Sequence, residues 1–529
     1  MDAALTAKYR AAGWWPGERL VDLFAGHVEA DPHRLSVRDD RGRSLTRREL
    51  WLESGIFVDL LADSGVRPRD TVLVLIPNRV EWQVVLLAIL RLGAVPATIP
   101  MTTDATALTH VARLIGARAL VTVAQHRRVR TDELAVTVMA AVAHRLDVFV
   151  LEDHQPRVVT GSGDLAGPAP DAVNHVMFTS STTGMPKAVM HTEDTMAAVN
   201  IGFERRFDIT QDTPLFMPSP LGHSVGAWHG GRLSLHSGAP LILQDRWDPE
   251  TALRTVADEA CVFTAAATPF LKDLVDVAWT APEPKFATLR TFLCGGAPVP
   301  PHLMEQAGTE LPHTFVSVLW GMTEGGVTTS VPGDDPAVTA RTAGLPLPDL
   351  ELGIRVPESD EVAEEGELVM RGPGVFTGYL GQPDLYLSSL TADGYFRTGD
   401  LARLGPDGRL TLVGRLKDLI VRGGVNLSPT PIEEAISAHP GVRQVAVIGT
   451  PDERIGERIC AVVTLAPDVT LTLDELNAWL TAGGLSKRLL PERLECVTDM
   501  PVTAAGKIRK LQLRDRILHD TTDVPNQED

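Results

Sequence analysis

Residues 179–187 bring together several groups that can bind phosphate. The stretch reads Thr-Ser-Ser-Thr-Thr-Gly-Met-Pro-Lys, so hydroxyls, backbone amides and one ammonium group fall within nine residues. Such groups can hold a polyphosphate. The stretch is not a Walker loop, because no Gly-Lys-Ser/Thr follows at the required spacing. The residues predicted to contact phosphate are Thr179, Ser180, Ser181, Thr182, Thr183, Gly184 and Lys187.

Five further stretches follow in order, and each combines residues that can bind a ligand or react. They are Gly295-Gly296-Ala297-Pro298, Trp320-Gly321-Met322-Thr323-Glu324, Tyr395-Phe396-Arg397-Thr398-Gly399-Asp400, Gly414-Arg415-Leu416-Lys417-Asp418 and Pro501-Val502-Thr503-Ala504-Ala505-Gly506-Lys507. With residues 179–187 they resemble the motifs of the adenylate-forming enzymes, which activate carboxylic acids with ATP. The resemblance covers nearly the whole chain. Within this family, the chain is most similar to short/medium-chain and cyclohexanecarboxylate-type acyl-CoA ligases.

The resemblance implies a role for each stretch in binding ATP or AMP. The adenine would be contacted by a turn of small residues that lets a flat base approach the backbone, namely Gly295, Gly296, Ala297 and Pro298. In the next stretch, Trp320 would place its aromatic ring against the base, and Gly321 and Met322 would make neighbouring contacts with the nucleotide. Thr323 would bind phosphate through its hydroxyl. Glu324 would hold Mg²⁺, a hard cation that favours carboxylate oxygen. Asp400 and Arg415 would bind the ribose.

The resemblance also implies two half-reactions. A carboxylate first attacks the α-phosphorus of ATP, giving acyl-AMP and pyrophosphate, while the catalytic Lys507 stabilises the developing charge. A thiol then attacks the acyl-AMP carbonyl and expels AMP. Between the two steps the C-terminal domain would rotate about Lys417. The rotation would present a CoA-binding segment whose glycines let a pantetheine arm pass close to the backbone, formed by Arg422, Gly423, Gly424 and Val425.

Residues 218–231 occupy the place where the family lines its acyl pocket. No acidic residue occurs there, so a substrate with an ammonium group is disfavoured. His223 matches a histidine at the junction of acyl pocket and thiol tunnel and is a candidate catalytic residue. The small residues of the segment favour a wide, apolar acid of medium-chain, alicyclic or polycyclic type. The predicted pocket residues are Gly222, His223, Val225, Gly226, Trp228 and Gly230.

The phosphate loop departs from the family pattern at two positions. Ser181 and Ala188 stand where the family has glycine, and a β-carbon can prevent a positive φ or a close approach to phosphate. An alternative to the complete CoA ligase is therefore an enzyme impaired in adenylation, which only transfers the acyl group of a supplied acyl-AMP to CoA. The sequence is also compatible with an aryl- or acyl-AMP ligase that loads a carrier protein, and with a noncatalytic nucleotide-binding partner.

The elements that must position these residues alternate in type along the chain. The buried run 71–76, a helical pattern over 81–92 and an extended return at 93–96 predict parallel strands covered by helices, an α/β fold. We expect an N-terminal adenylate-binding domain over 1–416, with layered sheets and a small β-rich subdomain at about 340–416. A small, mobile α+β domain over 417–529 would follow, with a helix at 432–438 and a strand at 444–448.

The bulk composition limits the partners. A formal net charge of −19 argues against nonspecific binding to nucleic acids or anionic membranes, although a local basic pocket can still bind a polyanion. The most apolar run, 84–90, is too short to span a bilayer. The N-terminus does not resemble a signal peptide, and four dispersed cysteines form no metal-binding spacing, so we expect a cytoplasmic enzyme. The expected ligands are a carboxylic acid, ATP or acyl-AMP, CoA and Mg²⁺. The sequence is also compatible with a homodimer.

Overall fold

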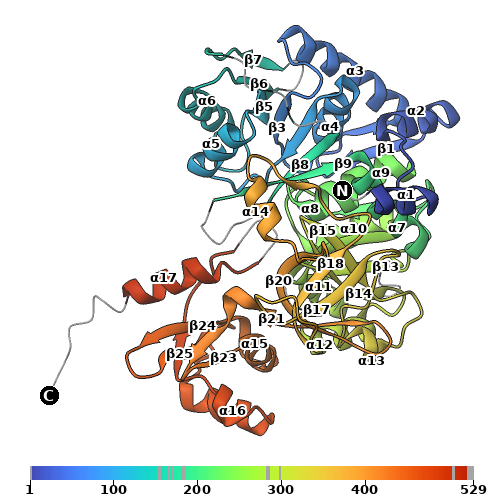
Figure 1. Cartoon of the computed structure of the whole chain (residues 1–529). Helices are drawn as coiled ribbons and strands as arrows, with labels where there is room; N and C mark the ends of the chain where they lie inside the picture. The colour runs from blue at the N-terminus through green and yellow to red at the C-terminus, as the bar shows by residue number, and fades with distance from the viewer. Residues whose placement is uncertain are drawn as a thin grey trace.

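The computed structural model describes residues 3–152, 156–164, 167, 169, 172–179, 185–280, 286–296, 299–502 and 507–520. These residues form a large N-terminal domain of layered sheets and a smaller C-terminal domain, which lies at the lower left in Figure 1. The predicted α/β class is confirmed.

Two large sheets form the layers of the N-terminal domain. The eight-stranded sheet has the order β19-β9-β8-β4-β3-β5-β6-β7. Its strands are β3 (Thr71–Leu75), β4 (Val95–Thr98), β5 (Ala119–Val123), β6 (Asp147–Leu151), β7 (Arg157–Val159), β8 (Val173–Thr179), β9 (Lys187–Thr192) and β19 (Gly378–Tyr379). The nine-stranded sheet has the order β16-β15-β14-β13-β12-β10-β11-β1-β2. Its strands are β1 (Leu35–Asp39), β2 (Ser44–Thr46), β10 (Leu215–Met217), β11 (Leu241–Leu243), β12 (Phe263–Ala267), β13 (Thr291–Gly295), β14 (Phe315–Met322), β15 (Gly325–Thr329) and β16 (Leu345–Pro346).

Two smaller sheets complete the strands. A four-stranded antiparallel sheet consists of β17 (Glu351–Arg355), β18 (Glu365–Arg371), β20 (Phe396–Leu404) and β21 (Leu410–Arg415). The sheet of the C-terminal domain consists of β22 (Ile420–Arg422), β23 (Val425–Leu427), β24 (Val442–Asp452), β25 (Gly456–Leu465) and β26 (Arg493–Cys496).

Helices cover the sheets and connect their strands. Those of the first half are α1 (Ala3–Ala11), α2 (Leu20–Ala30), α3 (Arg47–Asp63), α4 (Val80–Leu92), α5 (Ala105–Leu114), α6 (Thr131–Ala141), α7 (Glu193–Phe207), α8 (Ser224–Gly226), the π-helix η1 (Ala227–Arg232), α9 (Leu233–Ser237) and α10 (Pro249–Asp258). The later ones are α11 (Thr268–Thr280), α12 (Pro301–Glu310), α13 (Pro336–Thr339), α14 (Pro383–Ser388), the 3₁₀ turn η2 (Leu416–Asp418), α15 (Thr430–Ser437), α16 (Leu473–Ala482), the 3₁₀ turn η3 (Lys487–Leu489) and α17 (Lys510–Asp520).

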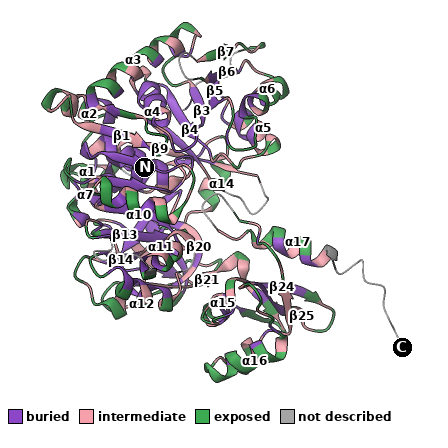
Figure 2. Ribbon diagram, turned by 180° about the vertical axis from the view of Figure 1, so that it is seen from behind, coloured by how far each residue is buried: buried purple, intermediate pink, exposed green. Residues whose placement is uncertain are grey.

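The first predicted strand–helix–strand unit is present. Strands β3 and β4 are parallel neighbours, and α4 connects them and ends at Gly93, which has a left-handed φ of 75°. Helix α4 packs against β3 and β4 of one large sheet and against β1 of the other. It is therefore buried on nearly every side, as the purple interior in Figure 2 shows, and the apolar run 84–90 belongs to this core rather than to a membrane. Within the described residues, none of the helices has the length and hydrophobicity required to cross a bilayer.

The β-rich segment is less self-contained than expected. Strands β17, β18, β20 and β21 do form their own sheet, with left-handed turns at Gly394 and Gly408. However, β16 joins the nine-stranded sheet, and β19 joins the eight-stranded sheet beside β9. Two strands of this range thus pair with strands that are distant in sequence, and a local pattern of strands and turns cannot show such pairing.

The predicted elements of the C-terminal domain are present with shifted ends. Helix α15 begins at Thr430, two residues before the expected start, and Pro431 lies in its first turn, where a missing N–H costs nothing. Strand β24 runs over eleven residues because it pairs along almost its whole length with β25.

Gly344 offers a test of how the chain that enters β16 packs against the end of β15. Its φ is 71°, and a Cβ there would lie 2.1 Å from the backbone carbon of Thr329. Gly333 also has a positive φ, of 95°, but no described heavy atom lies within 4 Å of its Cβ position. Gly333→Ala should cost about 1–2 kcal/mol through strain alone. Gly344→Ala should cost roughly 2–3 kcal/mol more because the backbones must separate, measured by urea denaturation; equal losses would contradict this packing.

Candidate active site

The predicted phosphate loop connects the antiparallel strands β8 and β9. Thr179 and Lys187 are cross-strand partners at the mouth of this hairpin. The residues between them that we predicted as phosphate ligands lie outside the described residues, namely Ser180, Ser181, Thr182, Thr183 and Gly184. The Lys187 ammonium lies 4.9 Å from the centroid of the Tyr379 ring. The strand pairing thus places a lysine at the edge of the loop.

Ala188 is accommodated without strain. It is fully buried in β9 opposite Phe178, and it is absent from the described residues that have a positive φ. Its carbonyl accepts a hydrogen bond of 2.8 Å from the Leu380 amide. A regular strand position does not require glycine, so the concern raised by this departure does not apply here. Ser181 is outside the described residues, and its effect stays a prediction.

Glu324 is a buried carboxylate held by a tyrosine. It is 4% exposed, and its Oε1 accepts a hydrogen bond of 2.8 Å from the Tyr379 hydroxyl. Burial raises the pKa of Glu324, and the Tyr379 hydrogen bond opposes this shift. The neighbouring Thr323 is also buried, and its carbonyl accepts a hydrogen bond of 2.8 Å from His191 Nε2. Residue 324 is therefore fixed both by its backbone surroundings and by its side chain.

A polar cavity of about 310 Å³ adjoins this carboxylate. It is lined by Lys187, Met322, Glu324, Glu367, Tyr379, Ser388, Ser389, Phe396, Arg397, Thr398 and Gly399. One ammonium group, hydroxyls and carboxylates thus surround a space of the size that a polyphosphate group needs.

Asp400 lies between two donors from different sheets. Its Oδ2 accepts a hydrogen bond of 2.9 Å from Trp320 Nε1, and its Oδ1 lies 2.7 Å from Arg415 Nε. Asp400 and Arg415 face each other in β20 and β21. The predicted base-binding turn begins at the end of β13, where Gly296 has a φ of 83° and no described heavy atom lies within 4 Å of its Cβ position. Ala297 and Pro298 lie outside the described residues.

The C-terminal domain brings Lys507 to this pair. Burial lowers the pKa of Lys507 to about 7, and the positive charges of Arg415 and Lys417 lower it further against the opposing effect of Asp400. Burial likewise lowers the pKa of His223 to about 4, and Lys507 adds to this shift. These mutual effects place Lys507 within electrostatic reach of both the Asp400–Arg415 pair and His223. Residues far apart in sequence thus influence one another electrostatically.

The segment predicted to bind CoA lies in a hairpin turn. Gly423 and Gly424, between β22 and β23, have φ values of 59° and 78°, and no described heavy atom lies within 4 Å of either Cβ position. Two successive left-handed residues are what a tight hairpin turn requires, so the turn itself explains both glycines. Arg422 forms an ion pair of 2.8 Å with Glu492, and Val425 is exposed.

The glycines of the acyl segment do not leave open space. A Cβ at Gly222 would lie 2.3 Å from the Ile99 carbonyl, and one at Gly226 would lie 2.3 Å from the Pro220 carbonyl. At Gly230 and Gly231 a Cβ would meet the side chains of Met217 and Trp82. The interpretation that these glycines widen an acyl pocket was wrong, because other parts of the chain fill the space beside them.

Most of the predicted pocket residues are packed in the core. Trp228 is 1% exposed, donates to the Met196 carbonyl over 3.1 Å, and packs edge-on against His191. Of the six predicted residues, only His223 and Val225 are more than slightly accessible. His223 caps α8, where its Nδ1 accepts from the Val225 amide at 3.4 Å. Sequence reasoning missed His229, a buried neighbour on η1 whose pKa burial lowers to about 3.

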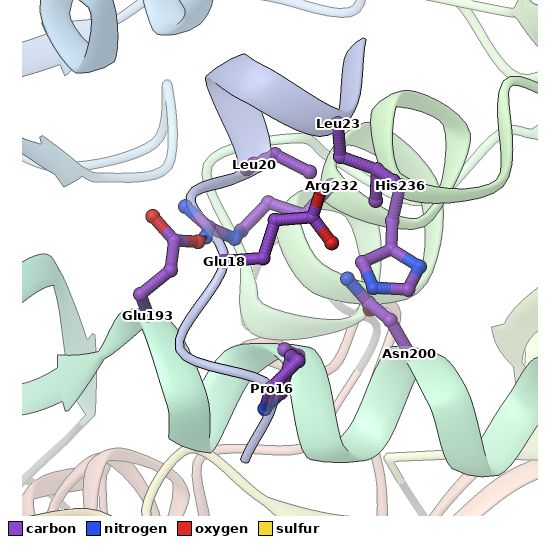
Figure 3. A pocket seen from close by; sticks show the side chains of 9 residues that line it. Pro16, Glu18, Leu20, Leu23, Glu193, Asn200, Arg232 and His236 are labelled. Carbon is purple, nitrogen blue, oxygen red and sulfur yellow. Dashed lines mark hydrogen bonds and ion pairs between the residues drawn. The ribbon is translucent and has the colours of Figure 1, made fainter. Parts of the chain in front are cut away.

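A second cavity lies beyond the end of η1 and is too small for an acyl group. It measures about 10 Å³, the space of a single water molecule. Figure 3 shows Arg232 reaching between Glu193 and Glu18, with Asn200 and His236 nearby. Arg232 is 1% exposed and forms an ion pair with Glu193. This pair joins η1 to the start of α7 and has a packing role.

Comparisons with known proteins find similar sequences and similar folds. The profile of the AMP-binding enzyme family matches residues 24–380, and that of the AMP-binding enzyme C-terminal domain matches residues 431–507. The medium-chain fatty-acid–CoA ligase of Escherichia coli (strain K12) is 30% identical over 535 residues, covering 98% of this chain and 93% of the relative. The salicyl-AMP ligase / salicyl-S-ArCP synthetase of Mycobacterium tuberculosis (strain ATCC 25618 / H37Rv) is 31% identical over 522 residues, covering 95% and 92%. The crystal structure of ATP-bound MatB from Rhodopseudomonas palustris is 25% identical, with a TM-score of 0.81, and the match covers 94% of this chain and 98% of that one.

The lowered pKa of Lys507 predicts unusual reactivity. With a pKa of about 7, the Lys507 amine is neutral and nucleophilic in roughly three quarters of the molecules at pH 7.5. For an ordinary lysine this fraction is about 0.1%. Reductive methylation followed by peptide mass spectrometry should show labelling of Lys507 that rises through about pH 7. ATP should slow it by shielding the amine and raising its pKa. Lys510, ion-paired with Glu433 at 2.7 Å, is the internal reference; identical pH profiles for the two lysines would refute the assignment.

Proposed function

We propose that this chain, which belongs to the AMP-binding enzyme family and is an ATP-dependent acid–CoA ligase, activates a hydrophobic carboxylic acid as acyl-AMP and transfers the acyl group to CoA. The observation that carries the proposal is the electrostatic effect on Lys507 of Arg415 and Asp400, which form an ion pair of 2.7 Å. A lysine from the smaller domain thereby comes within electrostatic reach of the residues that we propose bind the ribose. The arrangement suits the first half-reaction.

In this half-reaction the acid's carboxylate attacks the α-phosphorus of ATP and pyrophosphate leaves. Lys507, when protonated, stabilises the negative charge shared by the carboxylate and the α-phosphate. Asp400 accepts hydrogen bonds from the ribose hydroxyls, since a carboxylate has about four acceptor positions and Trp320 and Arg415 use two of them. Lys187, which lines the polar cavity, binds the phosphates.

The residues present fit a magnesium ion that accompanies ATP. Within the described part of the chain no group of three or more histidines, cysteines or acidic residues could hold a metal. Two carboxylates line the polar cavity together with Lys187, those of Glu324 and Glu367, and Glu367 already forms an ion pair of 2.7 Å with Arg397. Mg²⁺ is commonly bound through one or two carboxylates together with substrate phosphates. When bound, Mg²⁺ would neutralise phosphate charge. The role of the protein is to hold the Glu324 carboxylate in position.

The second half-reaction requires the thiol to reach the acyl-AMP carbonyl, from which AMP departs. We propose that the C-terminal domain rotates about Lys417 and that Arg422, Gly423, Gly424 and Val425 then approach the thiol arm. Because these residues lie in an exposed hairpin turn, they are accessible for such a contact. We keep 1–416 and 417–529 as the proposed domain bounds, with the β-rich residues from about 340 within the first.

The identity of the acid is proposed only as a class. The absence of an acidic residue in 218–231 supports an acid without an ammonium group. A relative that uses medium-chain fatty acids supports an apolar acid, and one that uses salicylate keeps the aryl-AMP ligase hypothesis, with a carrier-protein thiol in place of CoA. Since neighbouring atoms fill the space beside the glycines, His223 and Val225 are the remaining predicted contacts of the acyl group. Alicyclic and polycyclic acids stay in the range to be tested.

Two competing functions depend on particular residues. An enzyme impaired in adenylation rests on Ser181 alone, because Ala188 occupies an ordinary strand position. A noncatalytic binding partner would not require Lys507, which we propose acts in the first half-reaction. We keep the cytoplasm as the proposed location, since ATP and CoA are available there, and a homodimer as a proposal for the assembly.

Separate assays of the two half-reactions test the proposal. Wild-type protein should exchange pyrophosphate into ATP with a cognate acid from a panel of medium-chain, alicyclic, polycyclic and aryl acids. It should also form the CoA thioester from the synthetic acyl-AMP. Lys507→Ala should lower exchange by about 100-fold or more, because a charge aimed at the transition state is lost. It should leave the rate of thioester formation from acyl-AMP within a few-fold.

Lys510→Ala is the matched control. This lysine lies three residues away and forms an ion pair with Glu433 of the same domain. It should change neither half-reaction by more than about twofold, because this ion pair lies between α17 and α15 within the C-terminal domain. Thioester formation without exchange in the wild-type protein would favour the impaired enzyme, thioester formation only on a carrier protein would favour the aryl-AMP ligase, and neither reaction with any acid would favour the noncatalytic partner.

A further inference from the structure

Tyr379 lies between two parts of the site that are far apart in sequence. It belongs to β19, which adds to the edge of the eight-stranded sheet, where Tyr379 pairs with Val189 and Gly378 with Met190. The next residue, Leu380, donates its amide to the Ala188 carbonyl at 2.8 Å. Tyr379 is thus anchored beside the strand that begins with Lys187. Its own side chain is 3% exposed.

The ring and the hydroxyl of Tyr379 make different contacts. The ring lies under the Lys187 ammonium, 4.9 Å from centroid to Nζ, a distance at which a cation is attracted to an aromatic face. The hydroxyl donates to Glu324 Oε1 at 2.8 Å. All three side chains line the polar cavity of about 310 Å³. One tyrosine therefore touches both the lysine at the phosphate loop and the acidic residue opposite.

The segment before Tyr379 also fixes the backbone of Glu324. The Phe376 amide donates to the Glu324 carbonyl at 2.9 Å. Gly325 has a φ of 103°, and a Cβ there would lie 2.3 Å from the Gly374 carbonyl, so the two turns are in close contact. With its backbone held, the Glu324 side chain keeps only its own torsions, and the Tyr379 hydroxyl restricts these.

We propose that Tyr379 is a positioning residue that orients the Glu324 carboxylate toward a divalent cation and holds the Lys187 ammonium for the same polyphosphate. The inference rests on the proposed function, since it assigns Tyr379 to the ATP–Mg²⁺ site. It adds a specific division of labour. The hydroxyl serves the metal, because a partner that hydrogen-bonds a ligating carboxylate fixes its orientation. The ring serves the lysine.

The test measures ATP binding by calorimetry over a series of Mg²⁺ concentrations, with no acid present so that no turnover occurs. For Tyr379→Phe, which keeps the ring, the Mg²⁺ concentration at half-maximal effect should rise about tenfold. ATP affinity at saturating Mg²⁺ should stay within about twofold of wild type. Tyr379→Leu, which also removes the ring, should in addition weaken ATP binding several-fold in the absence of Mg²⁺, and saturating Mg²⁺ should not restore it.

Tyr386→Phe is the matched control, because its ring packs against the same Phe376 at 5.2 Å and it too loses one hydroxyl. Its Mg²⁺ midpoint should equal that of wild type. In a Glu324→Gln background, Tyr379→Phe should cause no further shift, whereas a purely structural role would lower thermal stability and affect ATP binding at every Mg²⁺ concentration alike.

The outcomes separate the inference from the proposed function. If wild-type ATP binding depends on Mg²⁺ and the Tyr379→Phe midpoint is unchanged, the role of Tyr379 is refuted while the ligase activity stands. The same holds if the shift persists in full in the Glu324→Gln background. If Tyr379→Phe folds poorly, Tyr379→Leu and the Glu324→Gln midpoint still decide, because both must show weaker Mg²⁺ dependence. If wild-type ATP binding does not respond to Mg²⁺ at all, the metal role of Glu324 and this inference both fall.

Discussion

Asp400 is 4% exposed, and the geometry of the site follows from how the charge of its carboxylate is compensated. An unpaired buried carboxylate costs several kcal/mol, so donors must surround it. Trp320 supplies one from the nine-stranded sheet, and Arg415 supplies the other from the strand next to Asp400. This requirement binds the four-stranded sheet to the larger one. It also fixes the two carboxylate oxygens in the position where ribose hydroxyls would find further acceptor sites.

Two lysines lie within electrostatic reach of this pair. Lys417 has a pKa lowered by burial and then by Arg415, and Lys507 shows the same effect more strongly. These positive charges repel one another when no anion is bound. Part of the binding energy of a polyphosphate therefore comes from relieving this repulsion. A local basic site of this kind lies within a chain of net charge −19. The overall charge therefore argues against polyanionic surfaces without arguing against ATP.

The sequence was informative where a function depends on a short stretch and misleading where it depends on packing. Lys187, Glu324, Asp400, Arg415 and Lys507 could be picked out because each lies in a motif that is read locally. The glycines of 222–231 could not be interpreted that way, because what lies beside Gly222 or Gly231 is Ile99 or Trp82, more than a hundred residues earlier. Tyr379 was missed for the same reason. Its partners Lys187 and Glu324 meet it only because β19 adds to the edge of a distant sheet.

Residues 413–418 lie where we propose that the chain hinges between the two half-reactions. Arg415 lies on β21 and is tied to Asp400, so it stays with the large domain. Ser428 of the C-terminal domain donates a hydrogen bond of 2.6 Å to the Val413 carbonyl, and a Cβ at Gly414 would lie 2.4 Å from its Oγ. The proposed rotation about Lys417 would break this contact and withdraw Lys507, while Arg415 and Asp400 would keep the ribose. The proposed hinge lies two residues after Arg415, a position that would let Lys507 leave without releasing the adenylate.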